Sequence, residues 1–415
     1  MPTLLRKRKK DESLFKYIIA LTHLWLGLLS GVVLFVVCLT GSILVFEQPI
    51  TDAFNAKVAT VVPQQERVSL DSIQANYYKA HTLPLGRVTV PTEEDQAVHL
   101  YASNRKSGER ISVYANPYTG ELIGEDNAAV HTFFSTTMQL HRWLLVRGVG
   151  KTIVGISTVI FLFMLLGGIV LWWPKRIKQI KQVLTVKWDA KFYRLNYDLH
   201  NVLGFYAAFG LFFIAFTGLY FSFPAVRNGI KTTLGAEITQ KQAQQHNHNH
   251  GPEGGKKGNR GGNGNRNRKA PQKTYALQQG YELLQAQLPY NSEVRMSFPG
   301  RRNKNLRFQK YNTANAMGAY LPEYIEVNRQ GKLLLTQRYE DLPLDRKVTS
   351  IIRPLHTGEI MGWPSMILYF ILCAIGTSLP VTGFLIWWKR KGGTSKASKN
   401  TQKTMASKKR EMIAS

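Results

Sequence analysis

The chain has 415 residues and a formal net charge of +28, with 54 Lys and Arg against 26 Asp and Glu. This length is enough for two or three domains. The two cysteines of the chain, Cys38 and Cys373, both lie within apolar runs. This excludes a disulfide framework and an iron–sulfur centre held by thiolates.

Four long runs without any Asp, Glu, Lys or Arg predict membrane-spanning helices. In chain order they cover residues 17–46, 152–173, 199–226 and 360–388. Each run exceeds the roughly 20 residues that a helix needs to cross about 30 Å of hydrocarbon. The first run lacks a small-residue cleavage site and is too long for the core of a signal peptide, so we expect a retained signal anchor.

The distribution of the basic residues predicts the topology. Residues 1–16, 174–198 and 389–415 hold 22 of the 54 Lys and Arg but five of the 26 acidic residues. In a four-helix topology these segments share one side of the membrane, which the positive-inside rule assigns to the cytoplasm. We therefore expect an inner-membrane protein with both termini in the cytoplasm, whose basic residues face anionic lipid headgroups rather than nucleic acid.

The two long loops then lie in the periplasm, and their predicted elements follow the same order. Residues 70–80 and 275–288 have helical patterns, alternating segments follow, and each series ends in two strands around a glycine, Gly120 or Gly331. We predict a small α+β module in each loop. Residues 240–273 are rich in Gly, Asn, His and Lys and predict a disordered insertion. Its His246, His248 and His250 lack a rigid frame for a metal ion.

The expected fold class is an α-helical membrane protein, a tandem duplication in which each half has two transmembrane helices and one α+β module. The predicted segments are the basic N-terminus 1–16, helix 17–46, module 47–140, helix 141–173 with a periplasmic extension, cytoplasmic loop 174–198, helix 199–226, module 227–355, helix 356–388 with a periplasmic extension, and basic tail 389–415.

His23 and His200 form the first of two matched pairs of histidines. Each is followed four residues on by a glycine and 17 residues on by a Thr-Gly: Gly27 and Thr40-Gly41, Gly204 and Thr217-Gly218. Small residues beneath a membrane histidine leave room for a flat macrocycle, and they equally let two helices pack closely. The matched copies favour the macrocycle, because two facing neutral imidazoles are what six-coordinate haem iron requires. The chain has no Cys-x-x-Cys-His motif, so such a haem would be bound non-covalently.

His141 and His356 form the second pair. Each is followed at 26 and 27 residues by a pair ending in glycine and at 31 and 32 by a Trp-Trp: Gly167-Gly168 and Trp172-Trp173, Thr382-Gly383 and Trp387-Trp388. Continuous helices over these spans would be almost 50 Å long, at 1.5 Å per residue. We therefore expect these histidines at or above the outer interface unless the helices are broken, and Pro364 favours an irregularity. His131 is the alternative ligand to His141, and ordinary interfacial histidines are the alternative to the pair.

Other classes of function lack their signals. No Asp or Glu interrupts the four runs, which disfavours ion-coupled transport. The chain has no P-loop, dinucleotide-binding fingerprint or clear hydrolase motif. Any reducing equivalents must therefore come from a partner or a membrane carrier.

The combined motifs resemble the PepSY-associated transmembrane-helix family, whose members are often labelled iron-regulated membrane proteins. The resemblance covers nearly the whole chain outside the insertion, and the insertion departs from the family's pattern. It implies PepSY-type periplasmic modules and a similarity to inner-membrane ferrisiderophore reductases that bind two b-type haems. The motifs that carry it are His23-Leu-Trp-Leu-Gly27, Thr40-Gly41, Leu140-His141-Arg142, Trp172-Trp173-Pro174, Asp198-Leu199-His200, Thr217-Gly218, Leu355-His356-Thr357-Gly358, Val381-Thr382-Gly383 and Trp387-Trp388.

With this resemblance, we expect His23 and His200 to bind a haem b on the cytoplasmic side and His141 and His356 to bind a second haem b on the periplasmic side. Electrons from a quinol or a cytoplasmic reductase would reach a ferric siderophore or another ferric chelate outside. Arg301, Arg302 and Lys304 are candidates to attract an anionic chelate, although such a run is more often a solvated face. The alternatives are a membrane-anchored PepSY module that binds or regulates without redox activity and, less favoured, a siderophore transporter.

Overall fold

The structure, a computed structural model, describes residues 8, 12–104, 108–235, 274–300, 305–315 and 318–414, with side chains described up to residue 389. The chain divides into two compact units. The first, here called the bundle, comprises residues 1–45, 136–227 and 367–415. The second, here called the sheet unit, comprises residues 46–135 and 228–366.

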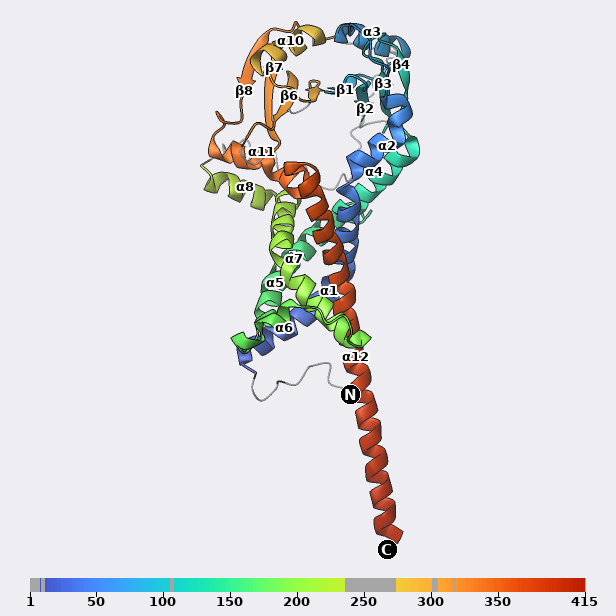
Figure 1. The fold of residues 1–415 in the computed structure, drawn as a ribbon, viewed down its shortest axis with the longest axis vertical. Helices are drawn as coiled ribbons and strands as arrows, with labels where there is room; N and C mark the ends of the chain where they lie inside the picture. Colours follow the sequence, from blue (N-terminus) through green and yellow to red (C-terminus); the bar gives the residue numbers. More distant parts are fainter. Residues whose placement is uncertain are drawn as a thin grey trace, which may run out of the picture. The chain divides into compact units, whose positions relative to one another are not determined.

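The bundle is built from four apolar helices that run side by side (Figure 1). Within the described residues, these four are long and apolar enough to cross a membrane, which agrees with the four predicted runs. The N-terminus of the first is capped by Ser13, whose hydroxyl accepts a hydrogen bond of 3.2 Å from the amide of Lys16. The helices are α1 (Leu14–Leu44), α5 (Gly150–Trp172), α7 (Phe192–Ser222) and α12 (Trp363–Ala414), of which Trp363–Lys389 is the apolar span.

Glycines let these helices approach each other closely. A Cβ atom at Gly31 of α1 would lie 3.6 Å from Pro380 of α12, and one at Gly376 of α12 would lie 3.1 Å from the sulfur of Cys38 on α1. Apolar side chains from all four helices fill the interior of the bundle, where they form one cluster: Leu34, Phe161, Leu165, Ala207, Ala208, Leu211, Ala215 and Leu372. Small residues at such crossings are typical of helices that associate within a membrane.

The helix expected over 141–173 is broken. α4 (Ala128–Trp143) ends seven residues before α5 begins at Gly150. Leu144 and Leu145, which follow α4, have left-handed backbone with φ of 54° and 59°. A left-handed residue cannot continue a right-handed helix, and for a leucine it is strained. The structure thus has the broken form of this segment, and His141 belongs to a separate helix.

The helix expected over 356–388 is broken in the same way. α11 (Leu344–Thr357) ends at Gly358, and a short 3-10 helix, η3 (Glu359–Met361), leads to Gly362 and α12. The two glycines have φ of 83° and 66°. Pro364 lies in the first turn of α12, where proline is tolerated. The interruption thus comes from the two glycines and not from Pro364.

The sheet unit contains one antiparallel sheet of eight strands, in the order β4-β3-β2-β1-β5-β6-β7-β8 (Figure 1). Alternate residues of the strands are buried with side chains of α3 (Leu70–Ala80) and α10 (Leu277–Gln287), including Tyr77 and Leu284. The strands are β1 (Leu85–Val90), β2 (Val98–Ser103), β3 (Arg110–Ala115), β4 (Leu122–Glu125), β5 (Val294–Ser297), β6 (Leu306–Asn312), β7 (Leu321–Val327) and β8 (Leu333–Gln337).

The two predicted α+β modules share this sheet. β1 pairs with β5 from Arg87 opposite Ser297 to Val90 opposite Val294. The pairing satisfies backbone groups that two separate four-stranded sheets would leave open at their edges. The expectation of two separate modules is therefore corrected to a single joined unit. The predicted helices and the two hairpins around Gly120 and Gly331 are confirmed.

Shorter helices complete the described chain. They are α2 (Glu47–Ala59), η1 (Ile177–Gln179), α6 (Ile180–Leu184) and α8 (Pro224–Thr233). The predicted insertion 240–273, with His246, His248 and His250, lies outside the described residues, as do Arg301, Arg302 and Lys304.

A buried polar network fastens α2 and the start of α4 to the sheet. Asp126 accepts hydrogen bonds from Asn55 of α2 (3.1 Å) and from the hydroxyl of Ser112 on β3, and it lies 3.5 Å from His99 of β2. Asn127 donates its amide to the side chain of Asn55 at 2.7 Å and accepts from the first amides of α4. These bonds fix where α2 and α4 leave the sheet.

The charge of Asp126 stabilises this network. Burial by itself raises the pKa of this carboxyl, but hydrogen bonds with His99 and Ser112 and the charge of His99 bring the pKa down to about 2. Since this value is lower than in an unfolded chain, the ionised carboxylate stabilises the fold at pH above about 4. That contribution, on the order of 2 kcal/mol, is lost as the pH falls toward 2.

We therefore expect Asp126→Asn to remove most of the pH dependence of opening in this region between pH 5 and 2.5. Hydrogen exchange of the peptides that cover β2, β3 and the start of α4 measures it. Asp95→Asn is the matched control, because Asp95 is exposed. Equal pH profiles for Asp126→Asn and the unmodified protein would contradict this assignment.

Candidate functional site

His200 donates a hydrogen bond from α7 to α12. Its Nδ1 atom lies 2.8 Å from the hydroxyl oxygen of Thr382. Thr382 gives its single hydroxyl proton to the carbonyls of Ser378 and Leu379 on its own helix, at 2.9 and 3.1 Å. With this proton on either carbonyl, the hydroxyl oxygen accepts, which assigns the proton of the imidazole to Nδ1. The lone pair of Nε2 is left for another partner.

His141 is held in the same way by α1. Its Nδ1 atom lies 3.0 Å from the carbonyl oxygen of Val37 and 3.2 Å from the hydroxyl oxygen of Thr40. A carbonyl accepts only, and the hydroxyl of Thr40 donates to the carbonyls of Val36 and Val37. Nδ1 of His141 is therefore a donor, and Nε2 again carries the lone pair.

Glycines make room for these rings. A Cβ atom at Gly383 would lie 3.2 Å from Cε1 of His200, and one at Gly41 would lie 3.3 Å from Cε1 of His141. The glycine that follows each threonine thus lets the imidazole lie flush against the backbone of the neighbouring helix. A Thr-Gly pair supplies both a hydrogen-bond acceptor and the space for the ring that uses it.

His23 also lies against a glycine, but no threonine hydroxyl of the described residues is placed beside its Nδ1 atom. A Cβ atom at Gly168 of α5 would lie 3.5 Å from Cε1 of His23, as at the other two sites. The preceding residue, however, is Gly167, which has no hydroxyl. Nδ1 of His23 is buried and has no hydrogen-bond partner among the described residues. The carbonyl of Met164 interacts with this ring, but outside hydrogen-bonding geometry.

His23 and His200 both belong to the bundle. His23 projects from α1 and its ring packs on α5, whereas His200 projects from α7 and its ring packs on α12. Two residues before His200, the buried carboxylate of Asp198 accepts a 2.9 Å hydrogen bond from Arg194. The structure thus brings the first predicted pair into one bundle.

The glycines below these histidines serve helix packing in this structure. A Cβ atom at Gly27 would lie 3.1 Å from the terminal methyl of Met164, and one at Gly204 would lie 3.4 Å from a methyl of Leu379. The space expected for a macrocycle at these two positions is thus filled by side chains of the neighbouring helices. Both contacts are made by flexible side-chain ends.

The second predicted pair is divided between the units. His141 belongs to the bundle, whereas His356, on α11, belongs to the sheet unit. His131, the alternative ligand, lies on the part of α4 that belongs to the sheet unit. The pairing of His141 with His356 stays a prediction.

The Thr-Gly pairs mark the repeats in the sequence, but their spacing does not name the histidine that each contacts. Thr40-Gly41 begins 17 residues after His23 on the same helix, and in the structure both residues contact His141. The role of Thr382 as an acceptor for His200 was also missed. The signal in the sequence is a glycine that follows a threonine or another glycine within a spanning helix, as in Thr40-Gly41, Gly167-Gly168 and Thr382-Gly383.

The residues of the bundle fit a haem better than a metal ion held by protein alone. No group of three or more His, Cys, Asp or Glu side chains able to share a metal ion occurs in the described part of the chain. A haem needs only one imidazole on each side of its iron. A histidine ligand ordinarily donates its other ring nitrogen to a fixed acceptor, as His200 and His141 do.

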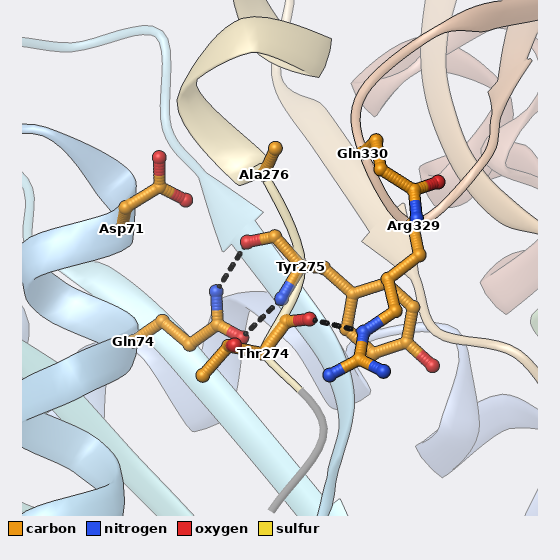
Figure 2. A pocket seen from close by; sticks show the side chains of 7 residues that line it. All are labelled: Asp71, Gln74, Thr274, Tyr275, Ala276, Arg329 and Gln330. Atoms are coloured by element: carbon orange, nitrogen blue, oxygen red, sulfur yellow. Dashed lines mark hydrogen bonds between the residues drawn. The ribbon is translucent and has the colours of Figure 1, made fainter.

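A polar cavity in the sheet unit is the second candidate site. It measures about 390 Å³ and lies between α3 and the segment that precedes α10 (Figure 2). Gln74 both donates to the carbonyl of Tyr275 (2.8 Å) and accepts from its amide (3.0 Å). Arg329 donates to the carbonyl of Thr274 at 2.9 Å. These polar groups are hydrogen-bonded to each other. They therefore leave fewer groups for a ligand, and the histidines are the stronger candidate site.

The comparisons with known proteins agree with the bundle. The family model described as the PepSY-associated TM region matches residues 20–390. Because the match spans most of the chain, the protein belongs to the PepSY-associated transmembrane family. It is a membrane protein whose described residues include four candidate spanning helices and a separate antiparallel sheet. No curated protein sequence is a significant match to the chain.

Proposed function

We propose that the chain is a di-haem reductase of the inner membrane, which passes electrons to a ferric chelate in the periplasm. The observation that carries the proposal is the position of Nδ1 of His200 and His141 against oxygen acceptors on the neighbouring helices. Each imidazole spends its Nδ1 proton on the neighbouring helix, which leaves the Nε2 lone pair that an axial ligand of haem iron must offer. Membership of the PepSY-associated transmembrane family supports it.

In this proposal His23 and His200 hold one haem b, and His141 and His356 hold a second. The haems supply one-electron transfer between the two faces of the membrane. Two histidine ligands on each haem would leave the iron no place to bind oxygen or the chelate, which suits electron transfer. The protein therefore acts by fixing the ligands, excluding water from them and keeping the two sites at different depths.

The direction of electron transfer follows from the proposed topology. The basic segments 1–16, 174–198 and 389–415 favour a cytoplasmic location for both termini, so the sheet unit would be periplasmic. A quinol or a cytoplasmic reductase would supply the electrons. Each Fe(III) in a siderophore or similar chelate would accept one electron, and the Fe(II) formed is bound less tightly by hard oxygen ligands.

We also propose that the chain arose by tandem duplication. The strand order is symmetric about the β1–β5 junction, with α3 before β1 and α10 before β5. In both halves a helix that bears a histidine, α4 or α11, is separated by left-handed residues from a spanning helix. The duplication would account for the two pairs of ligands.

Reduced-minus-oxidised absorbance spectra of the purified protein, expressed with ample haem, test the ligands. We expect a sharp α band that is partly lost in His200→Ala and partly lost in His141→Ala, because each removes a ligand of a different haem. His131→Ala is the control and should keep the full band. Full retention in His141→Ala with loss in His131→Ala would overturn the choice of the second ligand. A colourless unmodified protein would favour the non-redox PepSY module.

Vesicles test the reaction itself. With dithionite enclosed on the side of the termini, and ferric citrate with an Fe(II) indicator on the other side, we expect the unmodified protein to reduce iron across the membrane. His200→Ala should lower the rate at least tenfold, toward that of protein-free vesicles, because it breaks the path of electrons. A rate that is the same in His200→Ala and in the unmodified protein would contradict a path through this histidine. Uptake of intact ferric chelate without reduction would favour the transporter.

A further inference from the structure

The three histidines of the bundle are not equally supported. His200 and His141 each have a threonine hydroxyl within hydrogen-bonding distance of Nδ1, at 2.8 and 3.2 Å. At the corresponding position beside His23 the chain has Gly167, and Nδ1 of His23 has no hydrogen-bond partner in the described part of the chain. The two ligands proposed for the first haem therefore differ at Nδ1: His200 has a hydrogen bond there and His23 has none to any described residue.

This difference has a chemical consequence. A hydrogen bond from Nδ1 fixes the orientation of the ring and makes Nε2 a stronger donor to a metal. A ring without that bond is less firmly oriented and is the weaker donor. Loss of such an outer hydrogen bond typically lowers metal affinity by about 10-fold to 100-fold.

We propose that Thr382 is a positioning residue for His200 and that Gly167 leaves His23 as the weaker and more readily exchanged ligand of the same haem. The inference rests on the proposed function, because it concerns ligands of a haem. Thr40 has the role of Thr382 toward His141. The residue before the glycine on the neighbouring helix, a threonine or a glycine, thus sets how strongly each histidine binds the iron.

The threonines are not explained by helix structure alone. Thr22, Thr158 and Thr377 also donate their hydroxyls to carbonyls three or four residues earlier in their own helices. None of the bonds found for these three hydroxyls involves a histidine. Thr382 and Thr40 make the same bonds and in addition accept from an imidazole.

Exchange of Thr382 tests the first half of the proposal. We expect Thr382→Val to lose haem from the first site about 10-fold more readily and to raise the midpoint potential of the haem that remains. A weaker donor stabilises Fe(III) less, which is the reason for the rise. Thr382→Ser should restore both values, because it keeps the hydroxyl. Thr377→Val is the matched control on the same helix and should change neither.

Exchange of Gly167 tests the second half. Gly167→Ser adds a hydroxyl beside His23, and Gly167→Ala adds the same carbon without it. A Cβ atom at this position would lie 3.3 Å from a methyl of Ile19 and 3.8 Å from Nδ1 of His23, so a small shift admits either residue. We expect Gly167→Ser to lower the midpoint potential relative to Gly167→Ala and to slow the replacement of His23 by added imidazole, followed by electron paramagnetic resonance.

The outcomes separate this inference from the proposed function. If the unmodified protein binds no haem, the proposed function fails. If it binds haem but Thr382→Val matches Thr377→Val, and Gly167→Ser matches Gly167→Ala, the proposed function stands and this inference is wrong. Thermal unfolding of each variant identifies any that fails to fold. If Thr382→Val does, the comparison of Gly167→Ser with Gly167→Ala tests the inference, and if a Gly167 variant does, the comparison of Thr382→Val with Thr382→Ser tests it.

Discussion

An imidazole N–H buried among membrane helices has no water to bond to, so a neighbouring helix must supply its acceptor. At His141 and His200 that requirement is met by a backbone carbonyl and by threonine hydroxyls that face the ring across a glycine. The same contact sets how closely two helices approach and which nitrogen of the ring keeps its lone pair. The architecture of the bundle and the chemistry proposed for it therefore depend on one hydrogen bond, repeated at His200 and His141.

The interruption after α4 serves this contact. A continuous helix from His141 to Trp173 would have carried the histidine beyond the hydrocarbon. The strained backbone at Leu144 and Leu145 instead ends α4, and His141 contacts the backbone of α1 at Val37. Left-handed leucines cost about 1–3 kcal/mol each and persist where the surroundings impose them. We infer that the strain is tolerated because it positions His141.

The elements governed by local pattern could be predicted from the sequence. The four uncharged runs, the helices α3 and α10, and the hairpins at Gly120 and Gly331 follow from length, periodicity and turn residues. The pairing of β1 with β5 could not be predicted, because the two strands are about 200 residues apart in the chain. No local sequence pattern indicates which edge strand will pair with which. The left-handed backbone at Leu144 and Leu145 could not be predicted either, because a leucine side chain gives no preference for that conformation.

At the candidate site, residue types were easier to predict than partners. The recurrence of His23 and His200 pointed to a shared site, and the structure places both in the bundle. Spacing along one chain cannot tell which helix a ring will face, so the distance of 17 residues between His23 and Thr40 predicts no contact partner for Thr40-Gly41. The contact with His141 required the positions of two helices that are about 100 residues apart.

The central claim is that these histidines are ligands of haem iron. Its most direct measurement is the haem content per chain of the unmodified protein, determined as the pyridine haemochrome, together with the electron paramagnetic resonance spectrum of the oxidised form. We expect two haem b per chain, both low-spin with two histidine ligands. A preparation that is fully folded and supplied with haem, yet contains none or only high-spin haem, would contradict it.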